Sequence, residues 1–149
     1  MSRAALALSL LSVACGATDY GSMSIALRPH QLACDIQGLQ AKLQISGHGD
    51  CDLSVRADGE QKLIEGVCLD VPAGEPRQFR LVYFVSIEGD PVDLNLATAF
   101  AEADLTDWDR EEYVLSFAAS DLFVDIDDDA DKVSNLEEVC ANRNPRHFD

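Results

Sequence analysis

Basic residues are scarce in this sequence, which carries 11 Lys and Arg side chains against 27 Asp and Glu. The resulting formal net charge is −16 at pH 7. A protein that binds nucleic acid needs a basic surface that neutralises phosphates, and this sequence does not supply one. The composition therefore excludes nucleic acid as a partner, whereas an excess of acid suits cations, basic partners or solubility.

Recognisable catalytic motifs are also missing. The three histidines lack the HExxH spacing of a metalloprotease, and the chain has neither a G-x-S-x-G motif nor a phosphate-binding loop. Five carboxylates surround Trp108 in "DLTDWDREE", residues 104–112, but they crowd one predicted loop. We therefore expect a protein without catalytic activity. The alternative is a small exported hydrolase with a carboxylate site near Trp108, built on Asp107 and Asp109.

The N-terminal apolar run, residues 4–14, is too short to cross a bilayer, which takes about 20 apolar residues in a helix. Arg3 precedes the run, which therefore suits the apolar region of a signal peptide over residues 1–14. It leads into "LLSVAC", where small and apolar residues stand directly before a cysteine. This pattern resembles the lipobox of bacterial lipoproteins, which implies that Cys15 is lipidated and becomes the mature N-terminus. An ordinary secretory signal and a buried helix are the alternatives.

With lipid on Cys15, residues 15–21 form a short polar tether. The protein is then expected on the outer membrane or the cell surface, anchored through its lipid. Without that lipid it is expected in the periplasm or outside the cell. The sequence identifies no protein partner.

Four further cysteines are present in the chain: Cys34, Cys51, Cys68 and Cys140. An even number in an exported chain predicts two disulfides, with three possible connectivities. A zinc site is the alternative, but it needs cysteines that are paired two to four residues apart. The spacings here are 17, 17 and 72, so disulfides are the better interpretation.

The hairpin signal "ADGE" bears on the choice among these connectivities. If the hairpin turns over residues 58–61, two residues lie opposite each other when their numbers add to 119. Cys51 then faces Cys68, within the Cα separation that a disulfide needs. Cys34 and Cys140 would form the second bond and tie the start of the β domain to the C-terminal helix. A turn of another length shifts the register, and Cys34–Cys51 with Cys68–Cys140 is the main alternative.

Alternating apolar residues predict strands along most of the chain. The clearest is residues 38–47, in which every second residue is apolar. Residues 77–89 alternate too, but Val82 and Phe84 make the opposite face apolar, so we expect a central strand that is covered on both sides. Residues 94–105 allow either helix or strand, and their place in a run of strands favours strand.

About seven short strands with a turn signal every 8 to 12 residues predict an antiparallel β-sandwich over residues 22–120. The first strand, "SMSIAL", is expected to stop at Pro29. The motif "PAG" before the strand "RQFRLVYF" resembles small immunoglobulin-like or transthyretin-like domains of bacterial outer-membrane lipoproteins, and the likeness covers residues 22–118. We expect a domain of this kind to be a binding or structural module.

The acidic stretch "DIDDDADKVSNLEE", residues 125–138, has the spacing of a calcium loop. Such a twelve-residue loop needs oxygen ligands at positions 1, 3, 5, 7, 9 and 12. A start at Asp125 puts Leu136 at position 12, where it cannot bind a cation. A start at Asp127 supplies all six, with position 7 binding through its backbone carbonyl: Asp127, Asp129, Asp131, Val133, Asn135 and Glu138.

Position 6 of this loop is Lys132, where the sharp turn with positive φ normally takes glycine. A non-glycine residue there costs on the order of 1 kcal/mol, and the lysine brings a positive charge close to the cation. Both effects weaken the predicted site. A solvated acidic tail is the alternative interpretation of residues 125–138.

The residues that follow, "SNLEEVCANRNP", predict a short amphipathic helix that ends before Pro145. Loop and helix together, residues 125–145, resemble the calcium motifs of thrombospondin type 3 repeats and of dockerin modules, which lack a full entering helix. The resemblance implies Ca²⁺ at five residues: Asp127, Asp129, Asp131, Asn135 and Glu138. We therefore expect residues 121–149 to form a calcium-binding extension with one copy of the motif, which does not imply cohesin binding.

Overall fold

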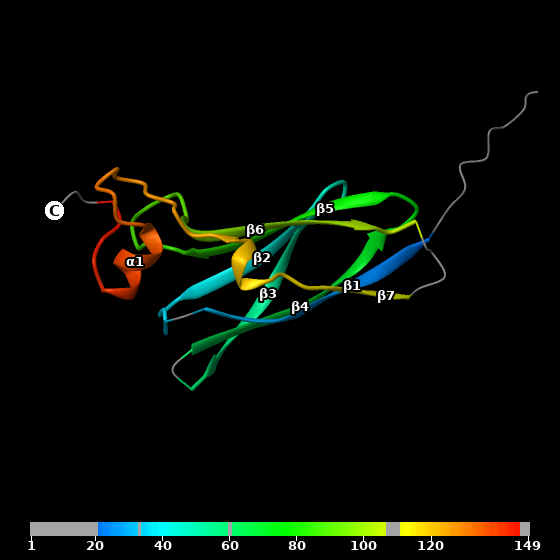
Figure 1. Ribbon diagram of the computed structural model, residues 1–149, viewed down its shortest axis with the longest axis horizontal. Helices are drawn as coiled ribbons and strands as arrows, with labels where there is room; N and C mark the ends of the chain where they lie inside the picture. Colours follow the sequence, from blue (N-terminus) through cyan, green and yellow to red (C-terminus); the bar gives the residue numbers. More distant parts are fainter. Residues whose placement is uncertain (1–20, 33, 60, 107–110, 147–149) are drawn as a thin grey trace, which may run out of the picture.

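The computed structural model describes residues 21–32, 34–59, 61–106 and 111–146. In this part the protein is mainly β: one mixed, strongly curled sheet is followed by a short C-terminal helix (Figure 1). The predicted signal peptide, the predicted lipidation site Cys15, and Trp108 with Asp107 and Asp109 lie outside the described residues.

Eight strands lie in the order β7-β1-β4-β3-β2-β5-β6-β8, and all neighbours are antiparallel except β1 and β7, which are parallel. The strands are β1 Ser22–Leu32, β2 Leu39–Ile45, β3 Gly49–Asp58, β4 Gln61–Pro72, β5 Pro76–Val85, β6 Leu94–Asp104, β7 Glu112–Leu115 and β8 Leu122–Phe123. A 3₁₀ turn, Ala119–Asp121, precedes β8, and the helix α1 spans Asn135–Cys140. The β domain was predicted to end at residue 120, but β8 lies beyond this boundary and still belongs to the sheet.

The strand β3 is where the sheet curls. Its first half, up to Leu53, pairs with β2, and its second half, from Ser54 onwards, pairs with β4. The prediction of a β-rich and largely antiparallel fold is confirmed. The two layers expected of a sandwich are instead parts of one continuous sheet, because a single long strand belongs to both. The sequence pattern marked β3 as a strand but carried no sign of its two partners.

The core lies inside the curl. The alternation predicted for residues 38–47 is confirmed, because the apolar side chains of β2 are buried. β5 is covered on both faces as predicted, since Val82 and Phe84 are buried as well as the residues between them. The largest fully buried side chains include Tyr83, Phe79, Ile25, Leu43, Ile64 and Leu81. Residues 94–105, which allowed helix or strand, form β6 over most of their length.

The first strand does not stop at Pro29, as the sequence predicted, but continues to Leu32. The register with β4 shifts between Leu27 and His30, so one strand has an extra residue there. Such a β-bulge lets a proline lie in a strand, because a residue in the bulge need not donate to the ladder.

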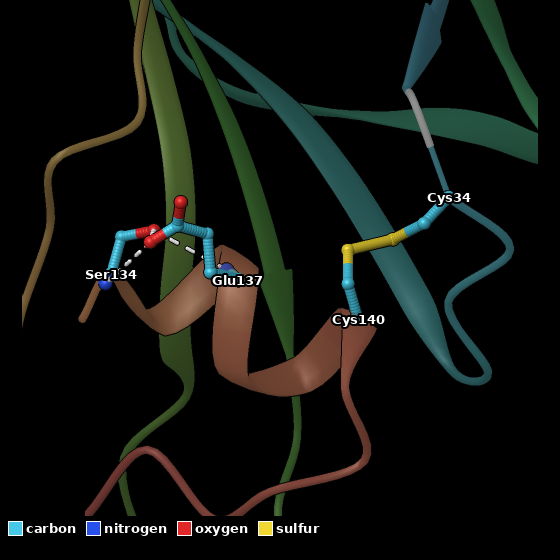
Figure 2. The surroundings of a disulfide bond; sticks show 4 residues. All are labelled: Cys34, Ser134, Glu137 and Cys140. Atoms are coloured by element: carbon cyan, nitrogen blue, oxygen red, sulfur yellow. Dashed lines mark hydrogen bonds between the residues drawn. A yellow bond between two sulfur atoms is a disulfide. The ribbon is translucent and has the colours of Figure 1, made fainter.

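Two disulfides cross-link the fold, in the pairing that the hairpin register predicts. The hairpin turns as expected, with Asp58 opposite Gln61, and its ladder ends at Ser54. Cys51 and Cys68 lie beyond the end of that ladder, with their Cα atoms 5.9 Å apart, and are bonded to each other. Cys34 is bonded to Cys140 at the end of α1, across 106 residues of chain (Figure 2). With all four thiols in disulfides, the zinc alternative is wrong.

No helix among the described residues is long and apolar enough to span a membrane.

Candidate metal centre

Residues 125–134 connect β8 to α1, and we call this segment the acidic loop. Figure 1 shows the acidic loop and α1 at one end of the sheet, beside the connection between β5 and β6. Three half-buried aspartates of the loop come together: carboxylate oxygens of Asp127, Asp129 and Asp131 lie within 4.8 Å of one another. These are positions 1, 3 and 5 of the predicted calcium loop, so the structure brings together its first three predicted ligands.

Asp127 shapes the loop through both of its carboxylate oxygens. Oδ1 accepts a hydrogen bond from the backbone N–H of Ala130 at 2.7 Å, and Oδ2 accepts one from the N–H of Lys132 at 2.9 Å. The chain is therefore wrapped around this carboxylate. Each oxygen keeps a further lone pair, so neither bond prevents contact with a cation.

Asp129 and Asp131 each use one oxygen in the same way. Asp129 Oδ1 accepts from the N–H of Asp131 at 3.2 Å, and Asp131 Oδ1 accepts from the N–H of Val133 at 2.7 Å. The other oxygen of Asp129, Oδ2, is buried and accepts no hydrogen bond from the described residues. A buried anionic oxygen without a donor is costly, and a cation at this place would remove the cost. The aspartates therefore fit a metal ion.

Lys132 has the backbone conformation that its position in the predicted loop demands. Its φ is 78°, in the left-handed region that favours glycine. The loop pattern predicted a positive φ at this residue, and the structure confirms it. Ala130 also has a positive φ, of 64°, which the sequence did not predict. The side chain of Lys132 is exposed.

Asn135 fixes the acidic loop to the sheet. It is 0% exposed, and its amide Nδ2 donates to the carbonyl of Asn95 at the start of β6, at 2.9 Å. Its Oδ1 accepts from the N–H of Asp128 at 3.0 Å, and its own N–H donates to the carbonyl of Ile126 at 2.7 Å. The sequence did not predict this structural role. The predicted contact between Asn135 and a cation stays a prediction.

The helix α1 is shorter than the predicted segment, because it ends at Cys140 rather than just before Pro145. Its start is defined by a capping box: Ser134 Oγ accepts from the N–H of Glu137 at 3.3 Å, and Glu137 Oε2 accepts from the N–H of Ser134 at 3.3 Å (Figure 2). Glu138 lies in the first turn and is only 1% exposed. It is not a member of the aspartate cluster, and its role as a ligand stays a prediction, as does that of the Val133 carbonyl.

Arg146 makes a further attachment that sequence reasoning missed. Its guanidinium forms an ion pair with Asp90 in the β5–β6 connection and lies 3.7 Å from Asp128 in the acidic loop. It also donates to the carbonyl of Val92 at 3.1 Å. An isolated arginine near a terminus gives no signal of such a role in a single sequence.

The donor atoms of the cluster are all oxygens, which suits hard cations such as Ca²⁺ or Mg²⁺ better than metals that prefer nitrogen or sulfur. The protein is therefore an acidic β protein that is cross-linked by two disulfides and has a candidate cation site. Disulfides of this kind indicate an oxidising, extracytoplasmic setting. Comparison of the chain with family models, with curated proteins and with solved structures found no match.

Proposed function

We propose that the chain is an exported module without catalytic activity, which binds a partner or supports the cell envelope, and in which a structural Ca²⁺ fixes the C-terminal segment. The observation that carries the calcium proposal is the conformation of the acidic loop. Three aspartate carboxylates meet at the spacing of loop positions 1, 3 and 5, and the residue at position 6 has the positive φ of a calcium loop. This conformation supports the likeness to thrombospondin type 3 and dockerin motifs.

Calcium suits the site better than magnesium does. Ca²⁺ takes six to eight oxygen ligands at about 2.3 to 2.6 Å in variable geometry, whereas Mg²⁺ demands a tight octahedron and keeps several waters. The cluster brings together three carboxylates, and the loop pattern adds the Val133 carbonyl, Asn135 and Glu138. A divalent cation would also relieve the repulsion among three like charges.

The role of the cation would be mechanical. The acidic loop leads directly into α1, and α1 carries Cys140 of the disulfide to Cys34. Ordering the loop around a cation would hold the start of α1, while the disulfide holds its end. We expect a Kd of about 10⁻⁴ to 10⁻³ M, the range of extracellular modules, with Lys132 moving it towards the weak end.

The thermal midpoint of unfolding tests this function. A cation that binds only the folded state raises the midpoint as its concentration passes Kd. We expect millimolar Ca²⁺ to raise the midpoint of the wild type and of Asp125→Asn, which alters an exposed loop carboxylate outside the cluster. Asp131→Asn is expected to abolish the response. A wild-type midpoint that stays constant in millimolar Ca²⁺ would refute the calcium site.

The proposed attachment to the membrane has its own test. Protein isolated from its native membrane is expected to carry a diacylglyceryl group on an N-terminal Cys15, as the "LLSVAC" sequence implies. Mass spectrometry of the N-terminal peptide measures this directly. An unmodified N-terminus at another residue would remove the anchor from the proposal and leave a secreted or periplasmic module.

A further inference from the structure

Four side chains form a row across the solvent-facing side of the sheet. In the strand register, Asp50 of β3 lies opposite Gln44 of β2, Gln44 lies opposite Arg80 of β5, and Arg80 lies opposite Phe100 of β6. Gln44 Nε2 donates to Asp50 Oδ1 at 3.1 Å, and Arg80 Nη1 donates to Gln44 Oε1 at 3.5 Å. The guanidinium of Arg80 lies 5.6 Å from the centre of the Phe100 ring. The row is therefore linked along its length and ends in an aromatic ring.

Phe100 borders two adjoining hollows in the surface. Its side chain is 65% exposed, which is unusual for an aromatic residue. One hollow, of about 410 Å³, includes Gln44, Asp50, Gln78, Arg80 and Phe100 in its lining. The other, of about 340 Å³, is lined by Gln78, Phe79, Phe100, Ala101 and Glu102. Because Gln78, Phe79 and Phe100 line both, the two open hollows form one elongated, shallow site.

We propose that this site binds a neutral polysaccharide chain, with one sugar ring stacked on the face of Phe100 that Arg80 does not cover. A pyranose ring presents an apolar face of C–H groups, which packs on an aromatic ring, and a rim of hydroxyls that both donate and accept hydrogen bonds. The amide of Gln78 both donates and accepts, and Gln44, Asp50 and Arg80 keep donor or acceptor positions beyond the bonds that they make within the row. Their positions in adjoining hollows suit several consecutive sugars better than one compact ligand.

Other ligand classes fit the site less well. A peptide that binds by adding a strand needs the edge of a sheet, whereas β2 and β5 are inner strands with partners on both sides. An acidic polymer would be repelled by Glu102 and by a chain with a net charge of −16, although Asp50 itself is paired with Lys42 at 3.2 Å. A wholly apolar ligand would leave the amides and charges of the lining without partners.

This inference names a ligand for the proposed binding module and so rests on that role, but it does not depend on the cation. Native gel electrophoresis tests it, with gels that contain hydroxyethyl cellulose, xylan, galactomannan, soluble starch or polygalacturonate. We expect at least one of the four neutral polysaccharides to retard the wild type and polygalacturonate to leave its mobility unchanged. Phe100→Ala is expected to raise the dissociation constant at least about tenfold, because the stacking contact is lost.

Val114→Ala is the control, since Val114 is 51% exposed on β7, at the other edge of the sheet, and does not line the two hollows around Phe100. It is expected to bind like the wild type. The inference is overturned if no neutral polysaccharide retards the wild type, if polygalacturonate alone does so, or if Phe100→Ala behaves like Val114→Ala. The thermal midpoint of each variant shows that it is folded. The calcium response of the same samples distinguishes a failure of this inference from a failure of the calcium site.

Discussion

Two residues of the acidic loop, Ala130 and Lys132, adopt a backbone conformation that suits glycine, with φ of 64° and 78°. A side chain in this region costs roughly 1 to 2 kcal/mol, because Cβ approaches the carbonyl oxygen too closely. The N–H groups of both residues point to one carboxylate, that of Asp127. The loop thus contains strained backbone where it wraps around Asp127, the first predicted ligand.

Replacing Lys132 with glycine is therefore expected to raise the free energy of unfolding by about 1 kcal/mol, because it relieves the strain at φ 78°. It should also tighten Ca²⁺ binding, because a positive charge beside the site is removed. Denaturant titrations with and without Ca²⁺ measure both effects. Ala141→Gly is the control, since Ala141 has φ −90° and gains no such relief. A Lys132→Gly protein that is less stable than the wild type would contradict this explanation.

Some residues of the candidate site were predictable from the sequence and others were not. The positions of Asp127, Asp129 and Asp131 and the conformation of Lys132 follow from the loop pattern alone, because the spacing of a calcium loop is local in sequence. The burial of Asn135 and its bond to Asn95 were not predictable. The bond joins residues 40 positions apart, and a single sequence does not reveal such contacts.

Among the elements, α1 depends most on local sequence. It has six residues, fewer than an isolated helix needs to be stable in water. Its capping box satisfies two backbone N–H groups at its start, and the disulfide holds Cys140 at its end. Both ends of this short helix are therefore fixed by specific interactions.

Ser134→Ala is expected to lower the free energy of unfolding by about 1 kcal/mol, because the N–H of Glu137 loses its acceptor. Ser134→Thr keeps a capping hydroxyl and should have a smaller effect. Chemical denaturation of the three proteins makes the comparison. Equal stability of the alanine variant and the wild type would show that the cap does not stabilise the native state.

The strands were predictable to the extent that their pattern is local. The alternation in β2, the two-sided burial of β5 and the turn between β3 and β4 follow from residue periodicity and turn chemistry. The parallel pairing of β1 with β7 and the division of β3 between two partners did not follow. Both depend on how the curled sheet closes over its core, which is a property of the whole chain.

At the scale of the molecule, three interactions among the described residues attach the C-terminal segment to the strands and their connections. These are the disulfide between Cys34 and Cys140, the bond from Asn135 to the start of β6, and the ion pair of Arg146 with Asp90. All three lie around the acidic loop and α1, at the end of the sheet where the β5–β6 connection lies. The proposed cation would act at the same end.

The disulfide that spans most of the chain is expected to matter greatly for stability. Replacing both Cys34 and Cys140 with alanine should lower the free energy of unfolding by up to about 4.7 kcal/mol, since the bond closes a loop of 106 residues. Denaturation of this variant measures the loss. Digestion of the wild type without reduction should release a peptide that joins Cys34 to Cys140. A peptide that joins Cys34 to Cys51 would contradict the pairing.

The central claim is that a calcium ion occupies the acidic loop, and anomalous X-ray diffraction from a crystal grown in millimolar Ca²⁺ tests it most directly. We predict one anomalous peak, about 2.3 to 2.6 Å from carboxylate oxygens of Asp127, Asp129 and Asp131. Crystals of Asp131→Asn grown in the same way should lack it. The account would be contradicted if the three carboxylates kept the same arrangement in the crystal and no anomalous peak lay among them.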